Sequence, residues 1–294
     1  MKKIVLVWGF CVLLLGVSCN SGKGKTIVVG AKDYTEQDIL GNMLNFLITE
    51  HTDYKVDYKH EISSSILWAA IKSGDVDLSI DYTGTMYAHV LKGTETHDPQ
   101  EVYEISKKGL KDEYQILMLN PLGFNNTYTL SVRPETAEKY GLKTYSDLAK
   151  VSHELILGGT FEIFNRNDGI PNLKKTYNMS FKEEKAIDGI LRYTAINNNE
   201  IDITTAFSTD GMLIEHNLTV LEDDKNFFPP YHAVPLIRED SAKKFPEIIP
   251  LMEKLHNLFT DETMRDLNYQ VEVLKRNHAE VAKEFLIAKG LISN

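Results

Sequence analysis

The chain has 294 residues, of which 43% are hydrophobic and 25% are charged. These fractions are those of a globular protein, and the length is enough for two domains of ordinary size. The formal net charge is -10, from 42 acidic and 32 basic residues, and the sequence contains no basic run. Because phosphate binding needs clustered Lys and Arg, this composition argues against nucleic acid as a partner.

The first 18 residues have the charge and hydropathy pattern of a secretory signal peptide. Two lysines precede a mostly apolar run over 4–17, which is too short to favour a transmembrane helix. The segment ends in Leu-Leu-Gly-Val-Ser-Cys, which is similar to a lipoprotein signal with Cys19 as the lipidated residue. We therefore expect a signal peptide at 1–18 and a lipidated, polar tether at 19–25. The alternative is plain secretion with an incidental cysteine.

The sequence lacks the patterns of metal sites and of common enzymes. Only two cysteines occur, and removal of the signal would leave one, so a disulfide within the monomer and a Cys-rich metal site are excluded. The histidines lack metal-ligand spacing, and no Gly-x-Ser-x-Gly elbow or His-Glu-x-x-His helix is present. We expect no cofactor, no metal and no catalytic residue. The alternative from another functional class is a secreted hydrolase using Asp77 and Asp81.

The first third of the chain alternates predicted strands with predicted helices. Strands are expected at 27–30, 55–59 and 76–80, with helices opening at Thr35 and at 63–65 between them. Asp38 stands where it would complete a capping box with Thr35, and Gly74 would end the second helix. Strand-helix-strand repetition of this kind predicts an α/β fold with a parallel sheet.

A similar unit recurs 125 residues further along the chain. Residues 70–85 align without a gap to 195–210, and the strand in each copy ends on an aromatic residue, Tyr82 in one and Phe207 in the other. Two lobes of similar build would explain the repetition, and chance similarity of two helix-turn-strand units is the alternative. Ligands of open α/β sheets bind outside the carboxyl ends of strands, so we expect these two aromatic residues to face one cleft.

The remaining signals place the boundaries of the two lobes. We expect the chain to leave the first lobe near 123–128, after a strand at 116–119, and to return through the stiff segment 228–231. The first lobe would then comprise 26–124 plus 232–294, and the second lobe 125–231. The helical segment 243–291 would pack back on the first lobe.

Four aromatic residues stand at strand ends or in loops rich in Gly, Pro and Asn: Tyr82, Tyr128, Phe207 and Tyr231. Each alone is more typical of rim packing. Together they suit a quaternary ammonium, which cannot donate an N–H hydrogen bond and must be held by aromatic faces.

Six motifs follow one another along the chain: 30–37 (Gly-Ala-Lys-Asp-Tyr-Thr-Glu-Gln), 74–78 (Gly-Asp-Val-Asp-Leu), 81–85 (Asp-Tyr-Thr-Gly-Thr), 167–171 (Asn-Asp-Gly-Ile-Pro), 221–225 (Leu-Glu-Asp-Asp-Lys) and 229–231 (Pro-Pro-Tyr). As a set in this order they resemble the motifs of the glycine betaine/proline betaine/choline-binding proteins of osmoprotectant ABC importers, and the likeness runs from about Lys25 to the C-terminus. The resemblance implies a two-lobed periplasmic-binding-protein fold of type II, with the ligand in the interlobe cleft and no catalytic activity.

The resemblance also implies roles for individual residues. The four aromatic residues above would form a cage around the ammonium, while Lys32, Thr85 and Arg166 would hold a ligand carboxylate. Phe207 stands where members of the family carry Tyr, and Asn126, a possible further contact, stands where some carry Asp.

These roles imply a lipid-anchored, extracytoplasmic and monomeric protein that hands glycine betaine or a similar zwitterion or cation to an ABC permease in the membrane. The alternatives are choline, carnitine or another amine. An amine with N–H groups would need a carboxylate in the cage, and the sequence shows none.

Overall fold

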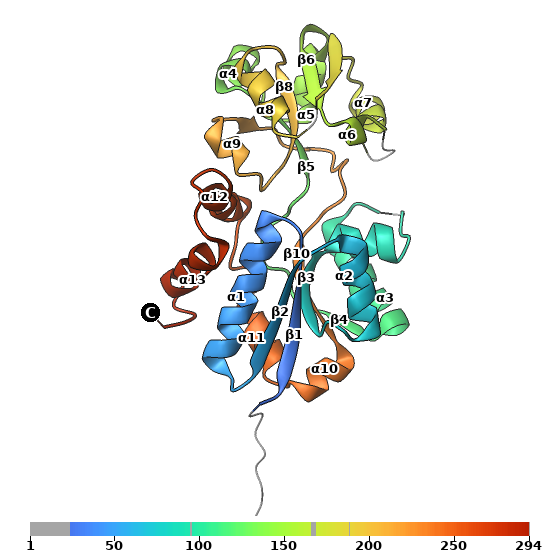
Figure 1. Ribbon diagram of the computed structural model, residues 1–294. Coiled ribbons are helices and arrows are strands. Elements are labelled where there is room, and N and C mark those ends of the chain that lie inside the picture. The colour runs from blue at the N-terminus through green and yellow to red at the C-terminus, as the bar shows by residue number, and fades with distance from the viewer. Residues whose placement is uncertain (1–23, 95, 166–168, 188, 294) are drawn as a thin grey trace, which may run out of the picture.

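The computed structural model describes residues 24–94, 96–165, 169–187 and 189–293. Within these ranges no helix is long and apolar enough to cross a membrane. The described chain forms two five-stranded sheets, one above the other in Figure 1, each with its own helices and hydrophobic core.

The first sheet has the strand order β2-β1-β3-β10-β4. Its strands are β1 (Thr26–Lys32), β2 (Lys55–Ile62), β3 (Leu78–Tyr82), β4 (Ile116–Met118) and β10 (Ala233–Arg238). β1 pairs in parallel with β2 and β3, as predicted, but β10 runs antiparallel to β3 and β4. The sheet is therefore mixed, because its last strand enters from the opposite direction after the chain returns from the second sheet.

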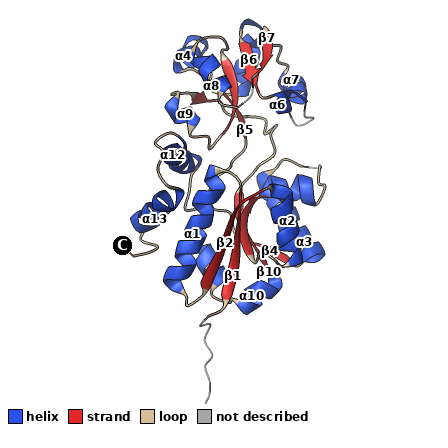
Figure 2. Cartoon of the chain, viewed as in Figure 1, coloured by secondary structure: helices blue, strands red, loops and turns tan. Residues whose placement is uncertain are grey.

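Helices cover both faces of the first sheet, with α1 on one side and α2 and α3 on the other (Figure 2). The helical elements here are α1 (Thr35–His51), α2 (Ser64–Ser73), the π-helix η1 (Thr85–Val90) and α3 (Pro99–Tyr114). The apolar residues of α1 recur at helical spacing, and those from Ile39 to Ile48 on that face are fully buried. Burial of this face against the sheet, rather than local capping, stabilises the helix.

The predicted caps of α1 and α2 are only partly correct. The N-cap of α1 is Tyr34, which makes no side-chain cap hydrogen bond, and Thr35 is already the first helical residue. The capping box of Thr35 and Asp38 was therefore a wrong prediction, and Asp38 instead accepts a hydrogen bond from the Tyr58 hydroxyl at 3.1 Å. Gly74 does end α2, in the left-handed conformation at φ 89° that glycine adopts without strain.

The second sheet has the order β7-β6-β8-β5-β9. Its strands are β5 (Tyr128–Val132), β6 (Ile156–Gly159), β7 (Glu183–Ala186), β8 (Ile203–Phe207) and β9 (Thr219–Val220). Its helices are α4 (Pro134–Tyr140), α5 (Tyr145–Val151), the short 3₁₀ turn η2 (Ser152–Glu154), α6 (Phe161–Asn165), α7 (Ile170–Tyr177), α8 (Leu191–Asn197) and α9 (Met212–Glu215). β6 is parallel to β7 and β8, while β5 is antiparallel to β8 and β9.

The chain passes between the sheets after β4 and again before β10, and the two crossing segments meet in a β-bridge between Asn125 and His232. On this basis we propose that 26–124 plus 232–294 form the first lobe and that 125–231 form the second. A pair of crossing strands of this kind is a hinge geometry.

The C-terminal segment is helical, with α10 (Glu239–Lys244), α11 (Ile248–Glu253), α12 (Asp261–Glu272) and α13 (His278–Ala288). Residues of α11 to α13 share the core of the first sheet with α1. The α12 helix also reaches the second sheet, near α9 in Figure 1, where Arg265 Nε and Nη2 donate to the Ser208 carbonyl at 2.9 and 2.7 Å. The expected packing on the first lobe is thus accompanied by a contact with the second lobe.

Candidate ligand-binding site

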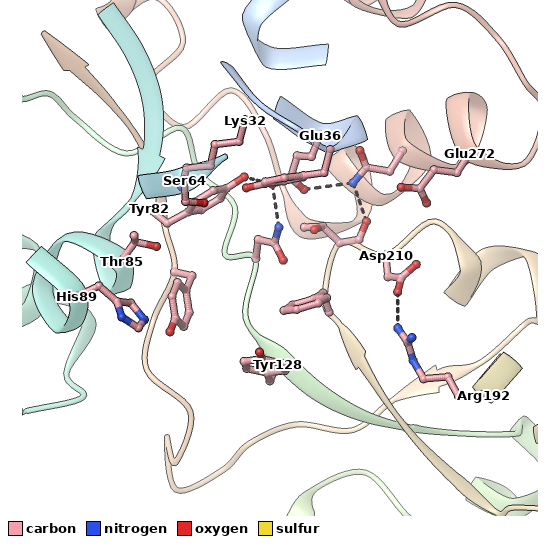
Figure 3. A pocket seen from close by; sticks show the side chains of 16 residues that line it. Lys32, Glu36, Ser64, Tyr82, Thr85, His89, Tyr128, Arg192, Asp210 and Glu272 are labelled. Atoms are coloured by element: carbon pink, nitrogen blue, oxygen red, sulfur yellow. Dashed lines mark hydrogen bonds and ion pairs between the residues drawn. The ribbon is translucent and has the colours of Figure 1, made fainter. Parts of the chain in front are cut away.

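A cleft of about 570 Å³ lies between the two sheets (Figure 3). Its walls include the last residues of β1, β3 and β8 and the first residue of β5, which all stand at the strand ends that face the other lobe. Seven residues named from the sequence line it: Lys32, Tyr82, Thr85, Asn126, Tyr128, Phe207 and Tyr231. The eighth, Arg166, lies outside the described residues, as does Cys19.

Two of the aromatic residues lie near the first sheet, Tyr82 at the end of β3 and Tyr231 in the second crossing, where it packs against the core of that sheet. Tyr82 ends β3 and is only 4% exposed. Its hydroxyl donates to Glu36 Oε1 at 2.5 Å and accepts from Gln37 Nε2 at 3.1 Å, so it is fixed by buried partners rather than by solvent. The Tyr231 ring lies against Gly84, where an added Cβ would come within 2.9 Å of the ring. Glycine is therefore required at 84 for this ring to keep its place beside the cleft.

The other two aromatic residues are cross-strand partners in the second sheet. Tyr128 on β5 pairs with Phe207 on β8, and their ring centroids are 4.7 Å apart at an interplanar angle of 34°. Tyr128 also packs on Phe228, whereas Phe207 remains 41% exposed at the end of its strand. The second sheet thus presents a tilted aromatic pair to the cleft, with the Phe207 ring as its accessible member.

Lys32 is buried and already has an anionic partner. Its Nζ lies 2.6 Å from Asp81 Oδ1 and 5.2 Å from the centre of the Tyr82 ring. The pair is close to neutral in total charge, but an ammonium has three donors, so two remain for other acceptors. Thr85, the first residue of η1, supplies a hydroxyl to the same cleft.

Among the described residues, three carboxylates line the cleft that also holds the aromatic residues, although the sequence showed none in the cage: Glu36, Asp210 and Glu272. Asp210 forms an ion pair with Arg192 at 3.2 Å. Burial and the neighbouring Asp210 raise the pKa of Glu272 to about 7. Figure 3 shows Asp210 and Glu272 on the same side of the cleft.

Glu36 is the most buried of the three, at 2% exposure. Burial raises its pKa above the ordinary value, and hydrogen bonds from Tyr82, Thr209, Asn126 and Asn268 oppose that rise. One sequence signal could have identified this residue. It stands three and four positions before Ile39 and Leu40, on the apolar face of α1, where an acidic residue is out of place unless it has buried partners.

Asn268 and Glu272 of α12 also line the cleft. From the sequence we expected this helical segment only to pack on the first lobe. Within the described ranges no group of three or more His, Cys, Asp or Glu residues could hold a metal ion. The described polar residues of the cleft surround the aromatic rings with hydrogen-bond donors and acceptors and with charges, of which Lys32, Arg192 and Asp210 are ion-paired.

Two α/β lobes joined by two crossings, with a cleft between them lined from both sides, define a solute-binding protein of the type II periplasmic-binding-protein class. The likeness to solved structures agrees with this class. A crystal structure of a glycine betaine/carnitine/choline ABC transporter protein superposes with a TM-score of 0.85 at 32% identity, covering 91% of this chain and 100% of that one. The apo YehZ structure from Escherichia coli gives 0.80 at 26% identity, covering 90% and 99%.

Residues 25–288 match the family model described as the substrate binding domain of ABC-type glycine betaine transport systems, and the chain belongs to this family. It is 37% identical to the carnitine transport binding protein OpuCC of Listeria monocytogenes, over 89% of this chain and 86% of that protein. It is 40% identical to the ergothioneine transport permease/ergothioneine binding protein EgtU of Helicobacter pylori. That match covers 92% of this chain and 49% of the relative, so this chain spans about half its length.

The family confirms the resemblance inferred from the sequence motifs and the predicted α/β two-lobed fold. A family of solute-binding proteins is not an enzyme class, and its members act outside the cytoplasm with a small-molecule ligand and a permease.

Proposed function

We propose that this protein captures a small zwitterion carrying a quaternary ammonium and a carboxylate, of which glycine betaine is the simplest, and delivers it to an ABC permease. The observation that carries the proposal is the meeting of aromatic residues from both sheets with Lys32 in one cleft. Binding between two lobes favours the closed form, which is the form that a permease can recognise.

The aromatic residues would hold the ammonium end of the ligand. Tyr82 and Tyr231 approach from one side and Tyr128 and Phe207 from the other. Each aromatic face contributes about 0.5 to 2 kcal/mol to a desolvated cation. Three or four faces therefore supply much of the roughly 8 kcal/mol that micromolar affinity requires.

The carboxylate end would be held by Lys32, Thr85 and Arg166. Choline has a hydroxyl in place of the carboxylate, so it would leave donors of this group without their acceptor, at a cost of about 1 to 3 kcal/mol. We expect glycine betaine to bind more tightly than choline by about ten- to hundredfold.

Isothermal titration calorimetry with glycine betaine, carnitine, ergothioneine, choline and glycine tests the proposal. Glycine is the matched control ligand, because it keeps the carboxylate and replaces the methyl groups by N–H donors, and it should not bind. The variant Thr85→Val keeps the side-chain shape and should weaken glycine betaine while leaving choline unchanged. Choline binding as tight as glycine betaine would contradict the carboxylate site, and glycine binding as tight would favour the alternative of an ordinary amine.

A larger betaine with its own N–H donors is a second candidate within the same class. Ergothioneine combines a trimethylammonium and a carboxylate with an imidazole-thione ring, and the carboxylates of Glu36, Asp210 and Glu272 offer acceptors beyond the aromatic residues. A relative that is 40% identical bears this ligand in its name. Ergothioneine binding at least tenfold tighter than glycine betaine in the same titrations would identify it as the ligand, and the reverse order would exclude it.

The anchor belongs to the proposal as well. Cleavage after residue 18 and lipidation of Cys19 would tether the binding protein to the membrane through 19–25, close to its permease. We propose that the protein works there as a monomer without catalytic activity, because seven of the eight residues assigned to the ligand line one cleft between two lobes of one chain.

A further inference from the structure

Glu36 lies at the junction of four segments of the fold. It stands in the first turn of α1, and its Oε1 accepts from the Tyr82 hydroxyl at 2.5 Å and from Asn126 Nδ2 at 3.0 Å. Its Oε2 accepts from Asn268 Nδ2 at 3.1 Å. These partners come from the end of β3, from the first crossing between the lobes and from α12. All four of these residues line the cleft, and Figure 3 shows Glu36 beside Tyr82.

The charge of Glu36 is not balanced by a cation among the described residues. The two cations that line the described part of the cleft are engaged elsewhere, Lys32 with Asp81 and Arg192 with Asp210. A buried carboxylate that has hydrogen-bond donors but no positive partner is costly to ionise. Burial accordingly raises the pKa of Glu36 against the effect of its four donors.

Two of the side chains that donate hydrogen bonds to Glu36 also line the aromatic part of the cleft. Tyr82 donates a hydrogen bond to Glu36, and its ring lines the cleft. A cation bound on that ring would therefore be separated from the carboxylate only by the Tyr82 side chain. Asn126 is likewise both a donor to Glu36 and a wall of the cleft. A quaternary ammonium placed there would be the positive partner that the folded chain does not supply.

We propose that Glu36 supplies the negative counter-charge for the cationic end of the ligand, so that ligand binding drives Glu36 into its ionised form and releases its proton to solvent. The inference rests on the proposed function. No bond is made or broken other than the O–H bond of the carboxyl group. A charge pair about 7 Å apart at an effective dielectric of about 20 corresponds to roughly fiftyfold in affinity.

The sign of the pH effect follows from the linkage. A cation near Glu36 favours the ionised form, so the bound state has the lower pKa of the two, and affinity rises as the pH rises through the pKa of the free protein. Other titratable groups face Glu36, namely Tyr34, Tyr82, Asp210 and Glu272, besides the Lys32–Asp81 pair. Among these groups Glu272 has a pKa raised to about 7, so its own titration would overlap that of Glu36. It is therefore replaced by Gln in the experiment.

The experiment uses Glu272→Gln as the background and compares it with the double variant Glu36→Gln/Glu272→Gln. Calorimetric titration with glycine betaine, or with whichever panel ligand binds best, is run from pH 5 to 7.5 in buffers of different ionisation enthalpy. The background should gain affinity with pH and release a proton on binding. The double variant should bind about ten- to hundredfold more weakly near pH 7 and should release none. Equal pH slopes and equal proton release in the two proteins would overturn the proposal.

A second variant keeps the test decisive if Gln at position 36 impairs folding. Tyr82→Phe retains the aromatic ring and removes the link to Glu36, and we expect a several-fold loss of affinity with reduced proton release. Tyr54→Phe is the matched control, because the Tyr54 hydroxyl donates to the Glu247 carboxylate in the same lobe and neither residue lines the cleft. An equal effect of the two Tyr variants would refute the role of Glu36. Absence of binding of every quaternary ammonium by the wild-type protein would instead remove the proposed function, and this inference with it.

Discussion

The replacement of Phe207 by Leu is the cleanest test of the aromatic site, because the structure separates the contribution of this ring to binding from its contribution to stability. Phe207 is 41% exposed at the end of β8 and its ring contacts chiefly Tyr128, at 4.7 Å. Leu keeps much of the apolar volume and loses the π face. Affinity for glycine betaine should fall by about 0.5 to 2 kcal/mol, or roughly two- to thirtyfold.

The cost in stability should be small. Loss of one aromatic pair at a half-exposed position amounts to about 1 kcal/mol, which lowers the Tm by about 2 to 4 °C in a protein of this size class. Tyr82→Leu would be harder to interpret. It would also remove the hydroxyl that Glu36 and Gln37 bind, so stability and affinity would fall together.

Calorimetric titration and thermal unfolding of the same preparations provide both quantities. Phe259→Leu is the matched control, since Phe259 is 2% exposed and packs on Phe124 in the first lobe, and it should lower the Tm with unchanged affinity. Phe207→Tyr should be mild, because it keeps the ring and adds only a hydroxyl. If Phe207→Leu lowers the Tm and leaves the affinity of the folded protein unchanged, the ring is structural and the aromatic cage is refuted.

Two further predictions concern other parts of the chain. Cys19→Ala should release the protein from the membrane fraction or leave its signal uncleaved, because a multiply acylated residue is a stable anchor, and unchanged fatty-acid labelling would exclude lipidation there. Glu272→Gln should raise the Tm at pH 8 but little at pH 4.5. The pKa of Glu272 is raised to about 7 in the folded protein, so at a pH above 7 the ionised group destabilises the folded state. This destabilisation begins as the pH rises above the ordinary pKa of a Glu side chain and is complete above pH 7, so it is small at pH 4.5. Equal Tm changes at both values would contradict this account.

The sequence alone determined the features that depend on local order. Alternating strands and helices predicted the α/β lobes, and the 125-residue repetition placed Tyr82 and Phe207 at strand ends, where the structure has them. These features follow from hydrophobic periodicity and turn residues, which act over a few residues. The predicted capping box of Thr35 was wrong, because the helix begins one residue earlier than expected, with Tyr34 as its N-cap. A shift of one residue changes which side chain can reach the free N–H groups of the first turn.

The tertiary structure alone decided how the charged groups are partnered. The sequence motifs assigned Lys32 to a ligand carboxylate and gave no sign of a partner within the chain, but parallel pairing of β1 and β3 brings it to Asp81, 49 residues away. Glu36 meets Asn268 across 232 residues, and only the packing of α12 against both lobes creates that contact. Such pairings depend on which elements become neighbours when the cores are buried. The hydrophobic pattern of a segment determines which face is buried, and the assembled fold determines which polar group lies opposite it.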